Sequence, residues 1–506
     1  MSARRAVPAL LGAVVLATSL LDAPPAAAQT RDFHLDCSAA WPGNGSPDSP
    51  WQRLDQANGF TFQPGDRLLL RRGTECAGVL SPRGSGAPGR PVQLGAYGEG
   101  GKPHIAGGGA RAAVHLRNVQ YWEIRDIRVS NFGPPPGPEE RRAGIYVTLT
   151  DFGVGHHYVV ADVEVHDVNG SDHKDPDPSG GILFGALGAL RPTRFQDIVI
   201  ERNRVSRVDR TGIGTISHWA RRAEHPNGPG SSFAPIRNLV VRDNAVTDVG
   251  GDGIVPQNTL GALVERNRVH QFNMRSAGWN AGIWPWNSDD TLIQFNEVSG
   301  GFGTRDSMAF DFDGGSRNVL YQYNYSHDND GGALLVCNDK DMVNDGGVFR
   351  HNISQHDGHP DVAVISVGCA RATNVRIHHN TFFTGRDTRL VANYTDTQIV
   401  AANNVFARAG GNSMIQDPHG RYQANAYFNM PVPERDGRAV TADPQLLNPG
   451  SASGLLDLGG YRLRAGSPAL RAGEPVPGAG NRDFFGNPMP SVPNIGAYQG
   501  PGVLGD

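Results

Sequence analysis

A short apolar strand followed by asparagine recurs along this chain from about residue 200 onward. Val, Ile or aromatic residues alternate with polar ones, an Asn follows, and a turn with a Gly-rich segment leads to the next strand. Alternation with a period of two predicts β-strands that bury one face. The recurring residues are Asn203, Asn244, Asn267, Asn296, Asn324, Asn352, Asn380 and Asn404, separated by 41, 23, 29, 28, 28, 28 and 24 residues.

This repeat length predicts a β-solenoid, in which each coil contacts only its neighbours. The apolar positions hold Val, Ile and Phe instead of a leucine consensus with a helical segment, which favours a β-helix over a leucine-rich repeat. We interpret the asparagines as structural, because stacked amides can bond from coil to coil at the strand spacing of roughly 4.8 Å. The sequence thus predicts an all-β fold with a single elongated domain, a right-handed parallel β-helix.

The two ends of the chain carry motifs that match a known group of proteins. Residues 45–54 (GSPDSPWQRL), 64–73 (PGDRLLLRRG) and 95–98 (GAYG) stand near the start, and residues 461–469 (YRLRAGSPA) and 483–488 (DFFGNP) near the end. With the repeats, they make the chain resemble the secreted pectate lyase-like right-handed parallel β-helix superfamily. That resemblance implies a carbohydrate-active protein, but it matches no single enzyme family and does not choose a reaction.

The chain divides into four expected parts. Residues 1–28 are predicted to be a secretory signal peptide, with Arg4 and Arg5 before an uncharged apolar stretch and an Ala-Ala-Ala run that ends at Ala28. We expect cleavage near Ala28 and a protein that is extracellular or periplasmic. Residues 29–110 would form an N-terminal cap and first coils, 111–430 the β-helix, and 431–506 a C-terminal capping segment.

The net charge and the cysteine content limit which binding partners and which covalent links are expected. The net charge is -4, so a nucleic acid or an anionic membrane is not an expected partner. Four cysteines in an exported chain predict two disulfides, Cys37 with Cys76 and Cys337 with Cys369, since other pairings would link distant coils. No C-x-x-C spacing exists, so we predict no metal site at the cysteines. A monomer is expected.

The most specific cluster of candidate residues is the segment Phe310-Asp311-Phe312-Asp313. Side chains alternate along a strand, and burying two unpaired carboxylates is costly, so both Phe should point inward and both Asp outward. If Ile283 stacks on Phe310, then Trp284 and Trp286 also point outward beside the aspartates. An offset of one residue would bury both tryptophans instead.

Paired carboxylates and aromatic rings are the groups that a glycoside hydrolase needs. We therefore predict Asp311 and Asp313 as catalytic residues, with His327 as an orienting group or proton shuttle. A Ca²⁺ site and plain surface charge remain alternatives for the two aspartates, and no cofactor is required. The predicted substrate-binding residues are Trp284, Trp286, Asn287, His218, Trp219, Asn338, Asp339, Lys340 and Asp341.

The outward face that carries these aspartates and tryptophans suggests three classes of function. The leading hypothesis is a secreted hydrolase that cleaves a polysaccharide or oligosaccharide. The second is a lyase that acts on a uronic-acid glycan by β-elimination, which needs a Lys or Arg base. Only three lysines exist, and of these only Lys340 lies near the predicted face, while Lys174 is expected several coils away. The third is a glycan-binding β-helix without catalytic activity.

Overall fold

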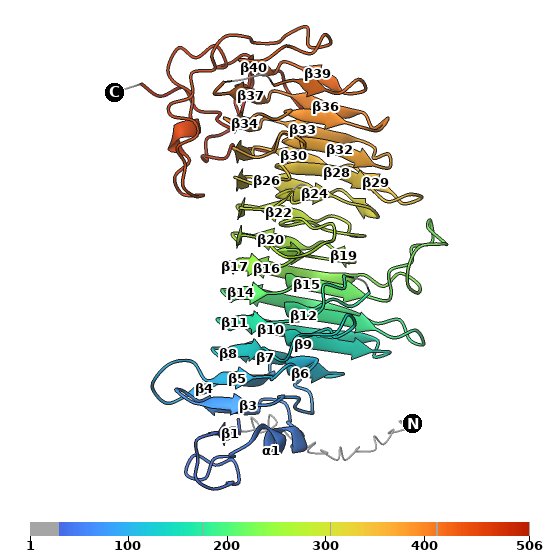
Figure 1. Cartoon of the computed structure of the whole chain (residues 1–506), viewed down its shortest axis with the longest axis vertical. Coiled ribbons are helices and arrows are strands. Elements are labelled where there is room, and N and C mark those ends of the chain that lie inside the picture. The colour runs from blue at the N-terminus through green and yellow to red at the C-terminus, as the bar shows by residue number, and fades with distance from the viewer. Residues whose placement is uncertain (1–29, 175, 304, 411–412, 505–506) are drawn as a thin grey trace, which may run out of the picture.

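The computed structural model describes residues 30–174, 176–303, 305–410 and 413–504. These residues form a right-handed parallel β-helix, a single stack of coils that runs the length of the molecule (Figure 1). The predicted fold is therefore confirmed. The predicted signal peptide and its cleavage site lie outside the described residues.

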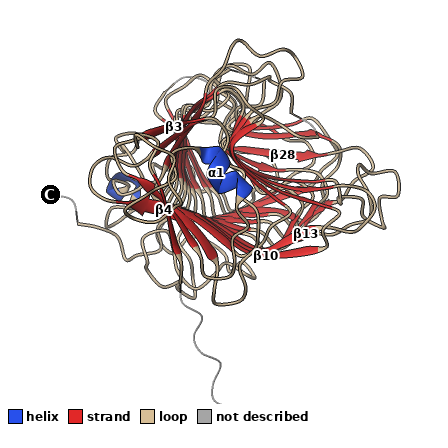
Figure 2. Cartoon of the chain, turned by 90° about the horizontal axis from the view of Figure 1, so that it is seen from below, coloured by secondary structure: helices blue, strands red, loops and turns tan. Residues whose placement is uncertain are grey.

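Three sets of parallel strands surround the interior (Figure 2). The longest sheet contains β1 (Asp32–Leu35), β2 (Arg67–Arg71), β4 (Val92–Tyr97), β7 (Trp122–Arg125), β10 (Val154–Ala161), β13 (Arg194–Glu201), β16 (Ile236–Arg242), β19 (Thr259–Leu260), β20 (Leu263–Glu265), β22 (Leu292–Gln294), β26 (Leu320–Gln322), β30 (Val348–Arg350), β33 (Val375–His378), β36 (Ile399–Ala402) and β39 (Arg421–Gln423).

The second sheet contains β3 (Glu75–Ala77), β5 (His104–Ala106), β8 (Arg128–Asn131), β11 (Glu164–Val168), β14 (Arg204–Val208), β17 (Ala245–Val249), β21 (Arg268–His270), β23 (Glu297–Ser299), β27 (Tyr325–His327), β31 (Ile353–Gln355), β34 (Thr381–Thr384), β37 (Val405–Arg408) and β40 (Ala426–Phe428).

The third face consists of two five-stranded sheets. These are β6 (Ala112–Arg117), β9 (Ala143–Thr150), β12 (Gly180–Leu187), β15 (Thr211–Ser217) and β18 (Ile254–Val255), then β24 (Phe310–Phe312), β28 (Leu334–Asn338), β32 (Ile365–Cys369), β35 (Val391–Asn393) and β38 (Ile415–Gln416). Ile283 bridges them, since it pairs with Ile254 on one side and Phe310 on the other. Beside this face β25 (Ser316–Arg317) pairs with β29 (Asn344–Asp345).

Alternating side chains explain the packing. On the longest sheet Val264, Ile293, Tyr321, Phe349 and Ile377 occupy matching positions on successive coils, and all are buried. Each coil thereby adds an apolar layer to one continuous core, which is the interaction that favours this fold.

The predicted asparagine ladder is present. Each Asn from Asn203 to Asn404 donates a side-chain hydrogen bond to the amide oxygen of the next, at 2.9–3.1 Å. Asn425 extends the ladder and donates in turn to Asp436 at 2.9 Å. Because these amides are buried, the ladder satisfies polar groups inside the turns of the stack.

Both ends of the stack are covered. Helix α1 (Leu54–Gly59) lies across the N-terminal end of the interior (Figure 2), and the Cys37–Cys76 disulfide links this region to β3. The C-terminal segment, which includes the 3-10 turn η1 (Gly459–Tyr461), folds back along the second sheet (Figure 1). There Tyr325 donates to the carbonyl of Ala452 at 3.2 Å.

No helix in the described part of the chain is both long and apolar enough to cross a membrane.

Candidate active site

A pocket of about 320 Å³ lies on the third face, where the two five-stranded sheets meet. Its lining residues come from four neighbouring coils and from one distant segment. They are Lys174, Trp279, Asn280, Ala281, Trp284, Asp306, Asp311, Asp313, Leu335, Cys337, Asp339 and Cys369. The pocket therefore combines carboxyl groups, aromatic rings and a lysine.

The orientation predicted for strand β24 is confirmed. Phe310 and Phe312 are fully buried in the core, and Asp311 and Asp313 line the pocket. Asp311 is only 5% exposed, and its Oδ1 is buried without a hydrogen-bond partner among the described residues. Alternation thus presents both carboxyl groups to the third face, although Asp311 lies deeper than the sequence suggested.

Burial and repulsion by neighbouring carboxylates favour the protonated forms of these two groups. Burial, and next the neighbouring Asp313, raise the pKa of Asp311 well above its ordinary value. Burial and the nearby Asp339 raise the pKa of Asp313 to about 8, although a hydrogen bond of 2.6 Å from the backbone N–H of Gly314 opposes this effect. At neutral pH the Asp313 carboxyl group is therefore mostly protonated.

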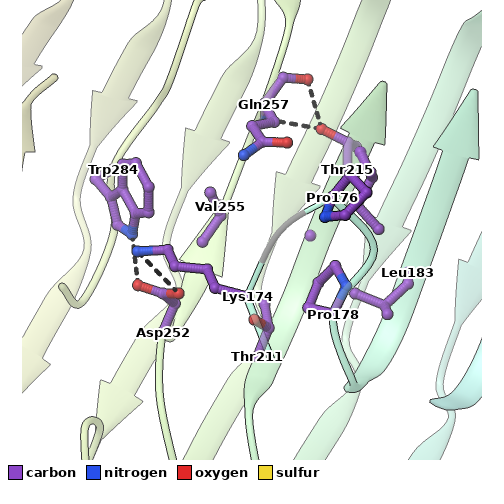
Figure 3. Close-up of a pocket in the computed structure, with 12 residues that line it drawn as sticks. Lys174, Pro176, Pro178, Leu183, Thr211, Thr215, Asp252, Val255, Gln257 and Trp284 are labelled. Atoms are coloured by element: carbon purple, nitrogen blue, oxygen red, sulfur yellow. Dashed lines mark hydrogen bonds and ion pairs between the residues drawn. The ribbon is translucent and has the colours of Figure 1, made fainter. Parts of the chain in front are cut away.

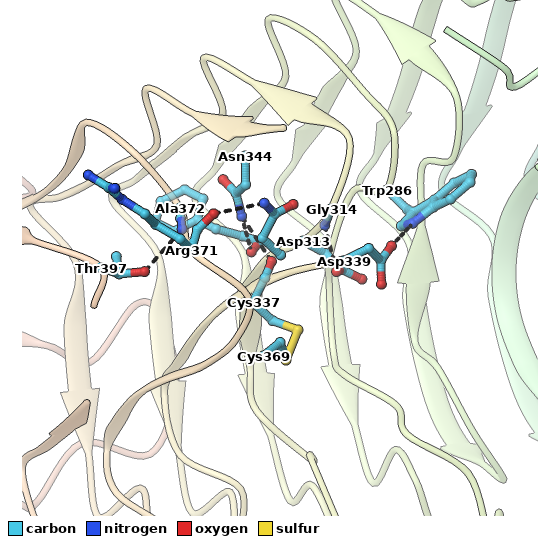
Figure 4. The surroundings of a disulfide bond; sticks show 12 residues. Trp286, Asp313, Gly314, Cys337, Asp339, Asn344, Cys369, Arg371, Ala372 and Thr397 are labelled. Atoms are coloured by element: carbon cyan, nitrogen blue, oxygen red, sulfur yellow. Dashed lines mark hydrogen bonds between the residues drawn. A yellow bond between two sulfur atoms is a disulfide. The ribbon is translucent and has the colours of Figure 1, made fainter. Parts of the chain in front are cut away.

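Both tryptophans point outward, because Ile283 pairs with Phe310 as the prediction required. Trp284 is 5% exposed, and its indole Nε1 donates to Asp252 Oδ1 at 2.9 Å. Trp286 donates to Asp339 Oδ2 at 2.9 Å (Figure 4). The register hypothesis is thus confirmed, and both rings are held by carboxylates.

The predicted disulfide between Cys337 and Cys369 is present and forms part of the pocket wall (Figure 4). Cys337 is two residues before Asp339 and one coil away from Asp313. The disulfide therefore anchors the end of β28, from which the Asp339 side chain extends into the pocket.

The placement predicted for Lys174 was wrong. The segment between β11 and β12 carries this residue across several coils to the pocket, where its Nζ donates to the carbonyl of Trp279 at 2.5 Å. The same Nζ lies 3.7 Å from Asp252 Oδ2 and 4.5 Å from the centroid of the Trp284 ring (Figure 3). An insertion can span coils in this way, which spacing along the repeat could not show.

Asp306 and Asp252 were missed by the sequence analysis. Asp306 lines the pocket, and burial raises its pKa to about 6 although Lys174 opposes the shift. Asp252 is 1% exposed and accepts a hydrogen bond from Trp284, so it holds the indole ring of Trp284 in the pocket wall. Two features of the sequence could have pointed to these residues: the Gly-Asp-Gly turn around Asp252, and the position of Asp306 shortly before β24.

His327 does not belong to this pocket. It lies at the end of β27 on the second sheet, stacks on Tyr325, and contacts Glu297 and Asp328 at 3.5 Å and 2.9 Å. Burial alone would lower its pKa, but the hydrogen bond with Asp328 and the neighbouring Glu297 carboxylate raise it to about 9. His327 therefore lies on a different sheet from Asp311 and Asp313, and its catalytic role stays a prediction.

Three of the predicted substrate-binding residues are structural instead. Trp219 is 2% exposed and belongs to the core. Asn287 is fully buried, donates to Asn258 and Ala220, and accepts from Arg222. Asn338 is buried and donates to the carbonyls of Met342 and Arg371. Their amide and ring surfaces are used within the fold, so the prediction for them was wrong.

The remaining predicted residues lie around the pocket. Asp339 is exposed and lines it, whereas Lys340 and Asp341 are exposed on the turn that follows. His218 is half-buried at the start of the insertion of residues 218–232, and its Nδ1 accepts from the backbone N–H of Gly188 at 3.3 Å. His225 of this insertion accepts from the backbone N–H of Val343 at 3.1 Å, so the insertion reaches the turn after β28.

Among the described residues, no group of three or more His, Cys, Asp or Glu side chains is arranged to hold a metal ion.

Comparison with known proteins gives one related sequence and several related structures. Over 90% of the chain, the sequence is 26% identical to a lacto-N-biosidase from Bifidobacterium longum subsp. longum, of which the match covers 35%. The chain thus spans about a third of the length of this relative. No protein-family model matches the chain.

Solved structures agree with the fold. The GH136 lacto-N-biosidase from Eubacterium ramulus has a TM-score of 0.63 and 24% identity, over 76% of this chain and 68% of that one. XylC in complex with xylose has a TM-score of 0.53 and 11% identity, over 92% of this chain and 98% of that one. At these identities the likeness shows a shared β-helix fold.

Proposed function

We propose that the protein is a glycoside hydrolase that cleaves an oligosaccharide in the pocket of the third face. The observation that carries this proposal is the pair Asp306 and Asp313, which line one pocket with pKa values of about 6 and about 8. At neutral pH one carboxyl group is then mostly ionised and the other mostly protonated. Glycoside hydrolysis needs this combination of a carboxylate and a carboxylic acid.

In the proposed reaction Asp313 donates its proton to the glycosidic oxygen as the bond to the anomeric carbon breaks. The carboxylate of Asp306 stabilises the positive charge that develops on the sugar. Water then adds its hydroxyl group to the anomeric carbon to form the new reducing end, and its other proton passes to a pocket carboxylate, which restores the protonated Asp313. Asp311 precedes Asp313 by two residues on β24, and burial and the neighbouring Asp313 raise its pKa, so its protonated form is favoured. The pair expected from the sequence, Asp311 and Asp313, is therefore revised to Asp306 and Asp313, with Asp311 in support.

The aromatic residues fit a sugar-binding role. Trp279 is 60% exposed at the pocket, and Trp284, although 5% exposed, also lines it. Aromatic rings pack against the C–H faces of pyranoses, and carboxylates bind their hydroxyl groups. The related lacto-N-biosidase supports an oligosaccharide substrate, so glycans that end in lacto-N-biose are the first candidates.

β-Elimination is the alternative, and the observation that favours it is Lys174, a basic side chain in the pocket. The two reactions leave different products. Hydrolysis adds water and gives a saturated reducing sugar, whereas elimination gives an unsaturated sugar that absorbs in the ultraviolet. Product mass on a panel of neutral and uronic glycans decides between them.

The test uses the wild-type protein and three variants on that panel. Asp313→Asn and Asp306→Asn should each lower turnover by about 10²–10⁴. Asp361→Asn is the matched control, because its carboxylate is 83% exposed and does not line the pocket. Normal folding of both pocket variants with full turnover of a cleaved glycan would exclude this pair. Binding of glycans without any product would favour the binding-protein hypothesis.

We propose that the protein acts outside the cytoplasm and as a monomer. Two disulfides support an oxidising compartment. Mass spectrometry of the exported protein tests the predicted cleavage near Ala28, and light scattering tests the oligomeric state.

A further inference from the structure

The segment between β11 and β12 crosses the coils of the third face and is fastened at several points. Asp177 accepts hydrogen bonds from Arg111 and Tyr146 at 2.8 Å and 2.7 Å, beside the N-terminal coils. Asp172 accepts from the backbone N–H of Ala277 at 2.9 Å, 105 residues further along the chain. Asp172, two residues before Lys174, is thus held at the coil of Ala277, whereas Asp177 is held beside the N-terminal coils.

Asp252 joins Lys174 to the wall of the pocket. Its Oδ1 accepts from Trp284 Nε1 at 2.9 Å and from the backbone N–H of Ala281 at 3.1 Å. Its Oδ2 lies 3.1 Å from the fully buried guanidinium of Arg210 and 3.7 Å from Lys174 Nζ. Since Lys174 also lies over the Trp284 ring, the lysine, the carboxylate and the indole hold one another in place (Figure 3).

The pocket holds more acidic groups than basic ones. Asp306, Asp311, Asp313 and Asp339 line it, and among its described lining residues Lys174 is the one cation. Of the other cations near this cluster, Arg210 pairs with Asp252 and Asp172. Arg305 lies over the Trp279 ring and also lowers the pKa of Asp306, but its effect is smaller than that of Lys174, and Asp252 acts in the opposite direction. Lys174 favours the ionised forms of Asp306, Asp311 and Asp313.

We propose that Lys174 is a positioning residue, which fixes Trp284 for sugar binding and keeps the Asp306 carboxylate ionised among its acidic neighbours. The hydrolysis that Lys174 would assist is the proposed function on which this inference rests. Lys174 need not touch the bond that breaks. Its ammonium group acts through the ring of Trp284 and through the charge on Asp306.

The test compares Lys174→Met, Lys174→Arg and the control Lys102→Met across pH. The methionine removes the charge and keeps much of the length, so Asp306 should retain its proton to a higher pH. The acidic limb of the kcat/KM profile should then move up by about one pH unit. Lys174→Arg keeps a cation, so the acidic limb of its kcat/KM profile should lie close to that of the wild type. Lys102 lies near the N-terminal end, 3.7 Å from Glu164, and its loss should leave the profile unchanged.

A second measurement does not depend on turnover. Titration of side-chain carboxyl signals by NMR, with Asp306→Asn for assignment, should show the Asp306 carboxyl group titrating at higher pH in Lys174→Met. An unchanged profile and an unchanged titration in a folded Lys174→Met variant would overturn the proposal. If the wild type cleaves no glycan, the proposed function fails, while the titration still decides the role of Lys174.

Discussion

Trp286 donates a hydrogen bond of 2.9 Å to Asp339, although 53 residues separate them in the chain. Asp339 follows Cys337 by two residues, and Cys337 is bonded to Cys369 of the next coil. The indole on one side and the disulfide on the other thus hold the Asp339 carboxylate in the pocket. This position matters because, after burial, Asp339 is the largest cause of the raised pKa of Asp313.

Asp339→Asn should therefore lower the pKa of Asp313 from its value of about 8. The amide keeps the hydrogen bond from Trp286 but removes the repulsion that favours the protonated acid. The basic limb of the kcat/KM profile should move to lower pH, while turnover at acidic pH changes little. A profile that coincides with that of Asp361→Asn would contradict this role for Asp339.

Loss of the aromatic rings should weaken binding more than turnover. Trp279→Ala removes a ring that is 60% exposed, so folding should be unaffected and KM should rise about tenfold, equivalent to about 1.4 kcal/mol. Trp284→Ala should raise KM similarly and also lower the Tm, because it removes the bond to Asp252. Trp41→Ala, at a residue 81% exposed near the N-terminal end, is the control. Equal KM values for Trp279→Ala and the control would remove Trp279 from the binding surface.

The sequence was sufficient to predict those features of the structure that the repeat pattern itself determines. The spacing of the asparagines predicted the solenoid and its ladder, and alternation around Phe310 and Phe312 predicted the outward aspartates. The register of Trp284 depended on one assumption, the pairing of Ile283 with Phe310, which the structure confirms. These features depend on neighbours in the chain or on the next coil, and a periodic pattern encodes both.

The sequence predictions failed mainly at residues whose contacts do not follow the repeat pattern. Lys174 reaches the pocket because Asp172 and Asp177 fasten an insertion across the coils, and no periodic signal records that path. His327 lies on a sheet along which the C-terminal segment folds back. The sequence suggested that Asn287 is a polar surface residue. Its amide instead donates to Asn258 of the preceding coil at 2.7 Å, in a buried amide contact separate from the asparagine ladder.

Substitution within the asparagine ladder should destabilise the whole fold. Asn324→Ala removes the acceptor of the Asn296 amide and the donor to Asn352, both buried. Leaving buried polar groups unpaired costs about 1–3 kcal/mol. Chemical denaturation should show this loss, whereas Asn227→Ala, at an exposed position of the insertion, should not differ from the wild type. Equal stability of the two variants would mean that water replaces the ladder bonds.

The raised pKa of Asp313 also predicts how stability depends on pH. The folded protein holds this proton with a pKa of about 8, against an ordinary value of 3.8. A raised carboxyl pKa contributes stability that is fully present below about pH 3.8 and is lost as the pH rises through about 8. Asp313→Asn mimics the protonated acid at every pH, so the variant lacks this loss.

The Tm of the wild type should therefore fall relative to that of Asp313→Asn as the pH rises from 5 toward about 9. The comparison is a difference between two proteins, because Asp306 and His327 also have raised pKa values and contribute to the slope in both. Differential scanning fluorimetry in matched buffers measures it, with Asp361→Asn as the control for an exposed carboxylate. Curves for the wild type and Asp313→Asn that stay parallel over this range would show that Asp313 is ionised in the folded protein, and Asp313 could then not act as the proton donor.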